Sequence, residues 1–266
     1  FAEDAAAFAP PADVQLKNPK SYKISGQPLP RFDIPGKVDG TAIYSQDVRR
    51  PGMVYAAIRN CPVPGGKLKS VDEAAAKSRR GVAQIVKLDD AVAVLADNFW
   101  RAKEAVNALE PVWDEGVNAK MSSAATLAAM KAAIQSGKDL TSDHSRGNVS
   151  GALTAAAKRF VAEYTVPYLC HAQMEPMSCG AHFKDGMLEV WGGFQDALSA
   201  RYAAAEAAGL PYEKVKVTHT ALGGSFGRRI YFDALTQCVK IAKQTDKPVS
   251  LMYTREEDMT QGKYRN

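Results

Sequence analysis

The sequence predicts an α+β protein built from two consecutive α/β units. Strand-like runs alternate with helix-like runs in residues 31–118 and again in residues 151–266. A stretch rich in Ser, Asp and Gly from Ser136 to Gly151 separates the two ranges, and we place the domain boundary there. The chain has 266 residues, of which 46% are hydrophobic and 24% are charged, so it can bury a sizeable core and has the composition of a globular protein.

Residues 1–30 predict an extended linker, because proline recurs along them. A short helical segment, Ala2 to Phe8, precedes the prolines. The first residue is Phe1 rather than Met, so we expect the natural start to be missing and any targeting signal to lie upstream.

The first α/β unit, residues 31–118, predicts a small sheet with a helix packed on it. Ala91–Ala96 is entirely apolar and therefore predicts a buried strand. Asn98–Leu109 has apolar residues at helical spacing. The further strands that we expect are Val38–Tyr44, Met53–Arg59, Val82–Leu88 and Pro111–Asp114, with a short helix at Val71–Ser78. Residues 119–150 follow as a helix, with Ser122 or Ser123 as its N-cap, and a connecting loop.

The second unit, residues 151–266, repeats the alternation of strand and helix. Gly209 and Pro211 end its first helix, Ala197–Ala208. A strand at Val215–Thr220, a tight loop at Gly223–Gly227 and a helix at Tyr231–Gln244 come next. The other strands that we expect are Arg159–Val166, a pair within Gly180–Trp191 that turns at Lys184–Gly186, and Val249–Thr254.

Charge and cysteine patterns exclude several functions. The net charge is +5, but Lys and Arg are spread along the chain rather than gathered in the patch typical of nucleic-acid binding. The four cysteines are far apart in sequence, which argues against a zinc site or an iron–sulfur cluster in this chain. No apolar run is long enough to predict a transmembrane helix.

The glycine loop Gly223-Gly224-Ser225-Phe226-Gly227, between a predicted strand and a predicted helix, is the most informative stretch. It lacks the register of a dinucleotide fingerprint and the Gly-Lys-Ser/Thr of a P-loop. It does satisfy G-x-S-x-G, the nucleophile elbow of serine hydrolases. All four histidines precede Ser225, however, whereas that triad needs a histidine after the serine. A plain tight turn is the remaining structural interpretation.

The loop gains meaning from two elements that precede it, His171-Ala172-Gln173-Met174-Glu175-Pro176 and Trp191-Gly192-Gly193-Phe194-Gln195. In this order and at this separation from the loop they resemble the molybdopterin-binding large subunit of the xanthine dehydrogenase/aldehyde oxidase family, most closely the isoquinoline 1-oxidoreductase type. Residues 31–40, 59–67 and 90–113 resemble the "hammerhead" domain of the same family. The resemblance therefore implies a hammerhead-type α/β domain followed by the first part of a molybdopterin-binding α/β domain.

The resemblance also implies a role for particular residues. Gln195 matches the glutamine that hydrogen-bonds an oxygen ligand of molybdenum, and an amide suits that role because it donates without adding charge. Gly223, Gly224, Ser225, Phe226, Gly227 and Arg228 match the loop that lies against the cofactor. We expect Ser225 to be a small residue that the cofactor can approach. No residue of this chain is expected to be a metal ligand, since the pterin dithiolene holds the metal.

Four charged or apolar positions qualify this interpretation. Arg228 and Arg229 either serve anionic groups of the cofactor or face water, and both alternatives stay open. Glu175 is expected to be a structural carboxylate satisfied by backbone amides rather than a base. Purine and aldehyde oxidases of the family place a glutamate where this chain has Ile230, so a purine-like substrate recognised through that carboxylate is not expected.

The activity implied by the resemblance is oxidation of an aldehyde or an aromatic N-heterocycle with water as the oxygen source. The base, a glutamate, would lie beyond Asn266, so we expect this chain alone to be incomplete and inactive. The expected cofactor is molybdopterin, in its cytosine dinucleotide form, with molybdenum. Expected partners are the rest of the large subunit, a small iron–sulfur subunit and cytochrome c as acceptor, in the periplasm or at the inner membrane. The alternative is a non-catalytic assembly module that keeps the fold without the cofactor.

Overall fold

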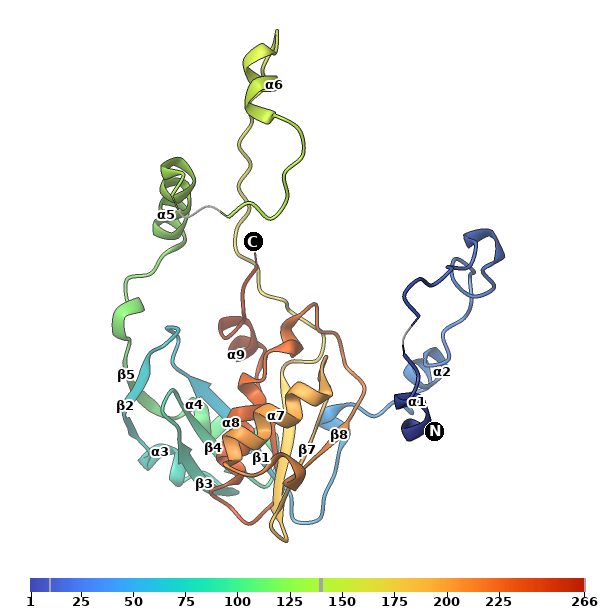
Figure 1. Cartoon of the computed structure of the whole chain (residues 1–266). Helices are drawn as coiled ribbons and strands as arrows, with labels where there is room; N and C mark the ends of the chain where they lie inside the picture. The colour runs from blue at the N-terminus through green and yellow to red at the C-terminus, as the bar shows by residue number, and fades with distance from the viewer. Residues whose placement is uncertain (10, 139–140, 266) are drawn as a thin grey trace. The chain divides into compact units, whose positions relative to one another are not determined.

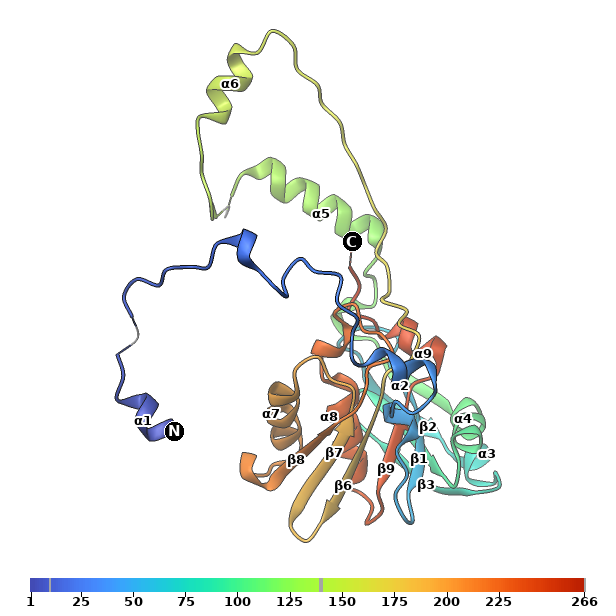
Figure 2. The ribbon, with the colours of Figure 1, turned by 90° about the vertical axis from the view of Figure 1, so that its right-hand side faces the viewer.

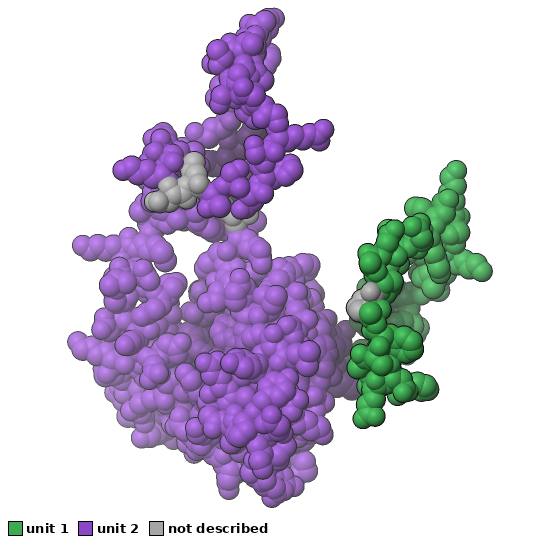
Figure 3. Space-filling model, in the orientation of Figure 1, with its two compact units in different colours: residues 1–42 green, residues 43–266 purple. Residues whose placement is uncertain are grey.

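The computed structural model describes residues 1–9, 11–138 and 141–265. It divides into two compact units, residues 1–42 and residues 43–266 (Figure 3). Residues 10, 139–140 and 266 fall in the predicted linker, in the predicted connecting loop and at the end of the second predicted unit, and they lie outside the described residues.

The unit formed by residues 1–42 contains two short helices, α1 (Ala2–Ala6) and α2 (Ile34–Val38). None of its described residues is buried. The predicted strand from Val38 to Tyr44 is not formed. Val38 instead ends helix α2, so that prediction is wrong. Pro35 at the first turn favours a helix start, and Tyr44 forms only an isolated bridge, with Ala221.

One seven-stranded mixed sheet organises residues 43–266, in the order β3-β4-β1-β9-β6-β7-β8 (Figures 1 and 2). Its strands are β1 (Val54–Asn60), β3 (Val82–Lys87), β4 (Ala91–Ala96), β6 (Ser178–Lys184), β7 (Met187–Gly192), β8 (Val215–His219) and β9 (Val249–Met252). Strand β9 lies between β1, with which it is parallel, and β6, with which it is antiparallel. Strands from both 31–118 and 151–266 therefore share one sheet, while the boundaries proposed for those ranges stay a prediction.

The two faces of the sheet are covered by different helices. Helices α7 (Ala197–Ala208) and α8 (Asp233–Ala242) pack with Ala56, Leu95, Val190 and Leu251 in the larger core. Alternate residues of the same strands point the other way, so that Val94 packs with α4 (Phe99–Asn107) in a second core. Strand β4 has apolar residues on both faces because both are covered, which confirms the prediction that Ala91–Ala96 is buried.

The remaining elements lie outside the main sheet. Strands β2 (Lys67–Asp72) and β5 (Glu110–Asp114) form a two-stranded antiparallel sheet, and α3 (Ala74–Lys77) follows β2. Helices α5 (Ser123–Ser136) and α6 (Val149–Ala155) contain no buried residue, and α9 (Arg255–Thr260) follows β9. Within the described residues, no helix combines the length and the apolar character that crossing a bilayer requires.

The mixed sheet with its helices confirms the predicted α+β class, and most predicted elements are present. Helix α7 begins and ends where the sequence predicts, with Asp196 as N-cap and Gly209 in the left-handed conformation that ends it. The prediction of a strand at Arg159–Val166 is wrong, since these residues are exposed and form no ladder. A β-branched run forms a strand only where a neighbouring strand can pair with it.

Candidate functional site

The glycine loop and Gln195 meet at one edge of the sheet. Strands β7 and β8 are parallel neighbours, so the segments that follow them emerge at the same edge. Gln195 follows β7, and the loop follows β8 and leads through a 3₁₀ turn, Arg228–Ile230, into α8. The structure thus brings together the two elements that the sequence analysis singles out.

Gln195 is held at both its backbone and its side chain. Its backbone N–H donates to the carbonyl of Arg229 at 3.2 Å. Its side-chain oxygen accepts a hydrogen bond from the Ser225 hydroxyl. Because the carbonyl end of the amide is engaged, the NH₂ end is the free donor, and no residue in the described part of the chain accepts from it. Gln195 is exposed, so this donor faces outward from the protein.

The backbone of the loop offers further donors beside Gln195. Gly224, Phe226 and Gly227 have positive φ angles of 95°, 55° and 96°. Such a conformation is strained for a residue as bulky as Phe226. The Phe226 side chain is 74% exposed. Among the described residues, none accepts a hydrogen bond from the backbone N–H groups of residues 224–227.

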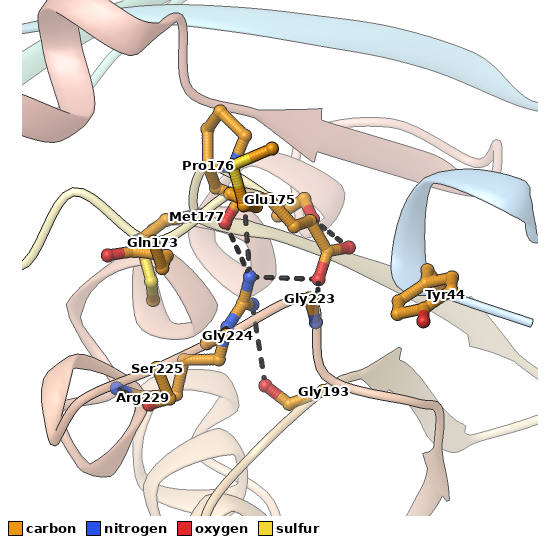
Figure 4. A network of polar contacts seen from close by, with 12 residues as sticks. Tyr44, Gln173, Glu175, Pro176, Met177, Gly193, Gly223, Gly224, Ser225 and Arg229 are labelled. Carbon is orange, nitrogen blue, oxygen red and sulfur yellow. Dashed lines mark hydrogen bonds and ion pairs between the residues drawn. The ribbon is translucent and has the colours of Figure 1, made fainter. Parts of the chain in front are cut away.

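Two of the glycines are required by packing within the protein. A Cβ on Gly223 would lie 2.3 Å from Cβ of Glu175, and one on Gly224 would lie 3.2 Å from Cβ of Gln173. The loop therefore lies directly on the 173–175 segment (Figure 4). The absence of side chains at these two glycines allows this internal contact.

Glu175 and Arg229 join the loop to that segment. The Glu175 carboxylate accepts from the Gly223 N–H at 3.0 Å and from Arg229 Nη2 at 2.9 Å, as drawn in Figure 4. Ser178 donates its hydroxyl to the second carboxylate oxygen at 3.1 Å. One backbone amide holds the Glu175 carboxylate, as predicted, but a guanidinium and a hydroxyl hold it as well.

Both arginines after the loop are buried, at 1% exposure each, so the alternative in which they face water is wrong. Arg228 makes a two-pronged ion pair with Asp233 at 2.8 and 2.7 Å, at the start of α8. Burial lowers the pKa of the Arg229 guanidinium below its ordinary value, and the Glu175 carboxylate opposes that shift. Whether Arg228 also serves the cofactor stays a prediction, because its guanidinium is already paired.

A second set of buried polar groups lies behind the loop. Gln173 is fully buried and donates to Asp258 at 2.9 Å. Neither ring nitrogen of His171 has a hydrogen-bond partner within the described residues. Burial, followed by the charges of Arg228 and Arg265, lowers the pKa of His171 below its usual value, which favours the neutral imidazole.

One cavity, of about 1070 Å³, is separate from the predicted site residues. Its lining includes Asn60, Tyr231, Asp233, Gln237 and Tyr253. Gln195 and the loop residues 223–227 do not line it. The free donors of the loop, rather than this cavity, therefore define the candidate site.

The residues present fit a cofactor rich in oxygen and nitrogen acceptors. The Gln195 amide and the amides of residues 224–227 are neutral donors, which suit such a group. The exposed Phe226 ring supplies an apolar wall beside them. No cluster of three or more metal-ligating side chains occurs among the described residues.

Sequence reasoning missed two features of the site, the hydroxyl contact of Ser225 and the contacts of Arg229. Ser225 is more than a small residue, because its hydroxyl both donates to Gln195 and accepts from the Arg229 N–H at 3.0 Å. The sequence offers two signals for these contacts. One is Glu175, an acid within the segment 171–177, and the other is the Arg228-Arg229 pair after the loop. Neither signal identifies its partner, since 54 positions separate Glu175 from Arg229.

Comparisons with known proteins identify the family of this chain. The family described as "Molybdopterin cofactor-binding domain" matches residues 133–266. The chain is 31% identical over 280 residues to a membrane-bound aldehyde dehydrogenase [pyrroloquinoline-quinone] of Gluconacetobacter polyoxogenes, with 98% of this chain and 35% of the relative covered. It is 28% identical over 260 residues to isoquinoline 1-oxidoreductase subunit beta of Brevundimonas diminuta, covering 95% of this chain and 33% of the relative.

A solved structure shows the same fold. The aldehyde oxidoreductase of Desulfovibrio gigas superposes with a TM-score of 0.70 at 18% identity, over 89% of this chain and 31% of that one. The chain thus spans about a third of the length of the proteins that it matches. The family match extends over half of the chain and includes Gln195, the glycine loop and both arginines. The chain therefore belongs to the molybdopterin cofactor-binding domain family.

Proposed function

We propose that this chain is part of the large subunit of a molybdenum hydroxylase that oxidises an aldehyde or an aromatic N-heterocycle, with water as the oxygen source. The observation that carries the proposal is the row of free donors, the Gln195 amide and the backbone N–H groups of residues 224–227, at one sheet edge. Family membership and the names of the two relatives, an aldehyde dehydrogenase and an isoquinoline oxidoreductase, support the reaction class.

The chain's own part in the reaction is binding and orientation. The bound molybdopterin, which we propose carries the cytosine dinucleotide, supplies the redox chemistry. Gln195 and the amides of residues 224–227 would hold it by neutral hydrogen bonds, and Phe226 would keep water from one side. Neutral donors orient an anionic group without adding a full charge that would perturb its electronics.

The side chain at position 230 restricts the substrate class. Ile230 is 50% exposed on the turn that follows the loop, so it presents an apolar surface beside the site. A carboxylate there would attract a substrate with hydrogen-bond donors, whereas isoleucine favours an apolar one. We therefore propose an aldehyde or a neutral N-heterocycle rather than a purine held through that carboxylate.

The rest of the enzyme is also a proposal. The relatives' names include the word subunit, which supports an assembly with a small iron–sulfur subunit. The remaining two-thirds of the large subunit would supply the general base, so the 266 residues alone are proposed to be inactive. We also propose that cytochrome c accepts the electrons. The proposed location is the periplasm or the inner membrane.

The test is a chemical analysis of the complete native complex, followed by a substitution. We expect molybdenum and a pterin, and we expect Gln195→Ala to lower kcat by about 10²–10³-fold, because one preorganised donor is lost. Circular dichroism and molybdenum content would show that the variant is folded and loaded. Pyrroloquinoline quinone in place of molybdenum would contradict the cofactor, and that outcome is worth measuring because one relative carries this quinone in its name.

The second candidate is a non-catalytic assembly module, favoured by Ile230 in place of the family's carboxylate. An assembled complex that lacks both molybdenum and pterin would support this candidate. Oxidation of an aldehyde or N-heterocycle that is lost in Gln195→Ala would contradict it.

A further inference from the structure

The Arg229 guanidinium lies under the glycine loop and contacts three separate segments of the chain. Its Nε donates to the Gly224 carbonyl at 2.9 Å, within the loop. Nη1 reaches the Gly193 carbonyl at 3.5 Å, two residues before Gln195. Nη2 donates to the carbonyl and carboxylate of Glu175 at 2.8 and 2.9 Å. Figure 4 draws contacts of this guanidinium as dashed lines. The side chain is 1% exposed, so water competes little for them.

The backbone of Arg229 adds two routes to Gln195. The Arg229 carbonyl accepts from the Gln195 N–H at 3.2 Å. The Arg229 N–H donates to the Ser225 hydroxyl at 3.0 Å, and that hydroxyl in turn donates to the Gln195 side-chain oxygen. The amide of Gln195 is therefore oriented with its NH₂ group outward, because its oxygen is occupied by Ser225.

Only a guanidinium satisfies this set of acceptors. Its donors spread in one plane over several directions, and here they reach carbonyls of the loop and of the segment before Gln195 while they pair Glu175. A lysine ammonium at the end of its flexible stem could keep the ion pair but not all the carbonyl contacts. Arg229 thus differs from Arg228, which pairs with Asp233 of the neighbouring helix.

We propose that Arg229, paired with Glu175, is a positioning residue that holds Gln195 and the donors of residues 224–227 in the arrangement that the cofactor needs. This inference rests on the proposed function, since it concerns the same site. Arg229 contacts no reacting group itself, and it acts through Gln195, Ser225 and the loop backbone.

The experiment compares three variants of the complete native complex, Arg229→Lys, Glu175→Gln and Ser225→Ala, with Arg50→Lys as the control. Arg50 also pairs with a glutamate, Glu189 at 3.1 Å, and lies over the Trp191 ring, but among the described residues it bonds neither the glycine loop nor residues 193–195. Arg50 precedes strand β1 and its partner Glu189 lies on β7, so Arg50→Lys is a matched substitution outside the glycine loop.

The first measurement is hydrogen exchange of peptides that contain Gln195 and Gly223, whose backbone N–H groups are hydrogen-bonded to Arg229 and Glu175, and it needs no bound cofactor. We expect Arg229→Lys to speed exchange there by roughly tenfold relative to Arg50→Lys, since one or two hydrogen bonds are lost. Glu175→Gln should have a smaller effect, because the carbonyl contacts of Arg229 to Gly224 and Gly193 remain. Equal exchange in Arg229→Lys and Arg50→Lys would overturn the proposal, whatever the cofactor proves to be.

The second measurement is the electron paramagnetic resonance spectrum of Mo(V), with kcat and KM. We expect Arg229→Lys and Ser225→Ala to keep their molybdenum, to change the spectrum and to lower kcat about tenfold to hundredfold with little change in KM. A molybdenum-loaded complex whose spectra and kcat are the same in all variants would overturn the positioning role but not the proposed function. If Arg229→Lys does not fold, Glu175→Gln, which weakens the pair and leaves the arginine in place, still decides.

Discussion

Gly180 and Trp191 face each other across the β6–β7 pair, and the indole fills the space above the glycine. A Cβ on Gly180 would lie 1.9 Å from Cε2 of the buried Trp191. Trp191 lies on β7, the strand that leads to Gln195. The glycine is thus required for packing, and the tryptophan that the sequence analysis places before Gln195 has a structural role.

For Gly180→Ala, we expect the free energy of unfolding of the full subunit to fall by about 1–3 kcal/mol, because the extra methyl overpacks a filled core. Urea unfolding of the single variants and of Gly180→Ala/Trp191→Phe measures the effect. Phenylalanine lacks the part of the indole that clashes, so the double variant should lose less than the sum of the single losses. A loss of unfolding free energy in the double variant that equals the sum of the two single losses would contradict the contact.

At the scale of elements, strand β1 and helix α9 are joined by a buried carboxylate. Glu257, on α9, accepts from the backbone N–H and the side-chain amide of Asn60, both at 2.7 Å. Asn60 accepts from Gln237 of α8, which in turn accepts from the Tyr253 hydroxyl. Burial raises the pKa of Glu257 above its ordinary value of 4.5, while the hydrogen bonds from Asn60 oppose that shift.

This raised pKa predicts a dependence of stability on pH. The folded protein keeps the Glu257 proton at pH values where the unfolded chain has lost it, so the contribution is present below pH 4.5 and is lost as pH rises through the folded pKa. Glu257→Gln keeps an oxygen acceptor for Asn60 and cannot ionise. We expect the stability of the native protein relative to this variant to fall as pH rises above 4.5 and then to level off. Unfolding free energies measured across that range test the sign, and a difference that rises with pH would contradict it.

Elements with strong local signals could be predicted from the sequence, and the others could not. Helix α7 has an Asp196 cap and a terminal Gly209, and these local features determine its bounds. Strand β2 and helix α9 were not predicted, because β2 has a mostly exposed pattern and α9 is only six residues long. Their presence depends on partners distant in sequence, since β2 pairs with β5 and α9 contacts β1 through Glu257.

At the scale of the whole molecule, β9 unites strands from the first and second halves of the chain in one sheet. It pairs with β1 on one side and with β6 on the other. Leu251, in the middle of β9, is fully buried in a core that contains residues of β1, β4, β6 and β7. Residues 31–118 and 151–266 therefore share a core as well as a sheet.

This shared core predicts that Leu251→Ala weakens both halves together. We expect the free energy of unfolding to fall by about 2–5 kcal/mol, through the lost transfer energy and the cavity left behind. Amide exchange should quicken in β4 and in β7 alike, measured on the full subunit. Faster exchange confined to β7 would show instead that the two ranges unfold independently.

The sequence by itself determined the fold class, most of the regular elements and the two segments, Gln195 and the glycine loop, that we propose as the site. Periodicity, caps and turn residues act over a few positions, so they can be recognised without the fold. Only the tertiary structure decided that strands of both halves form one sheet and that Arg229 is buried against Glu175. These contacts join residues far apart in sequence, and their energy depends on burial, which exists only in the folded chain.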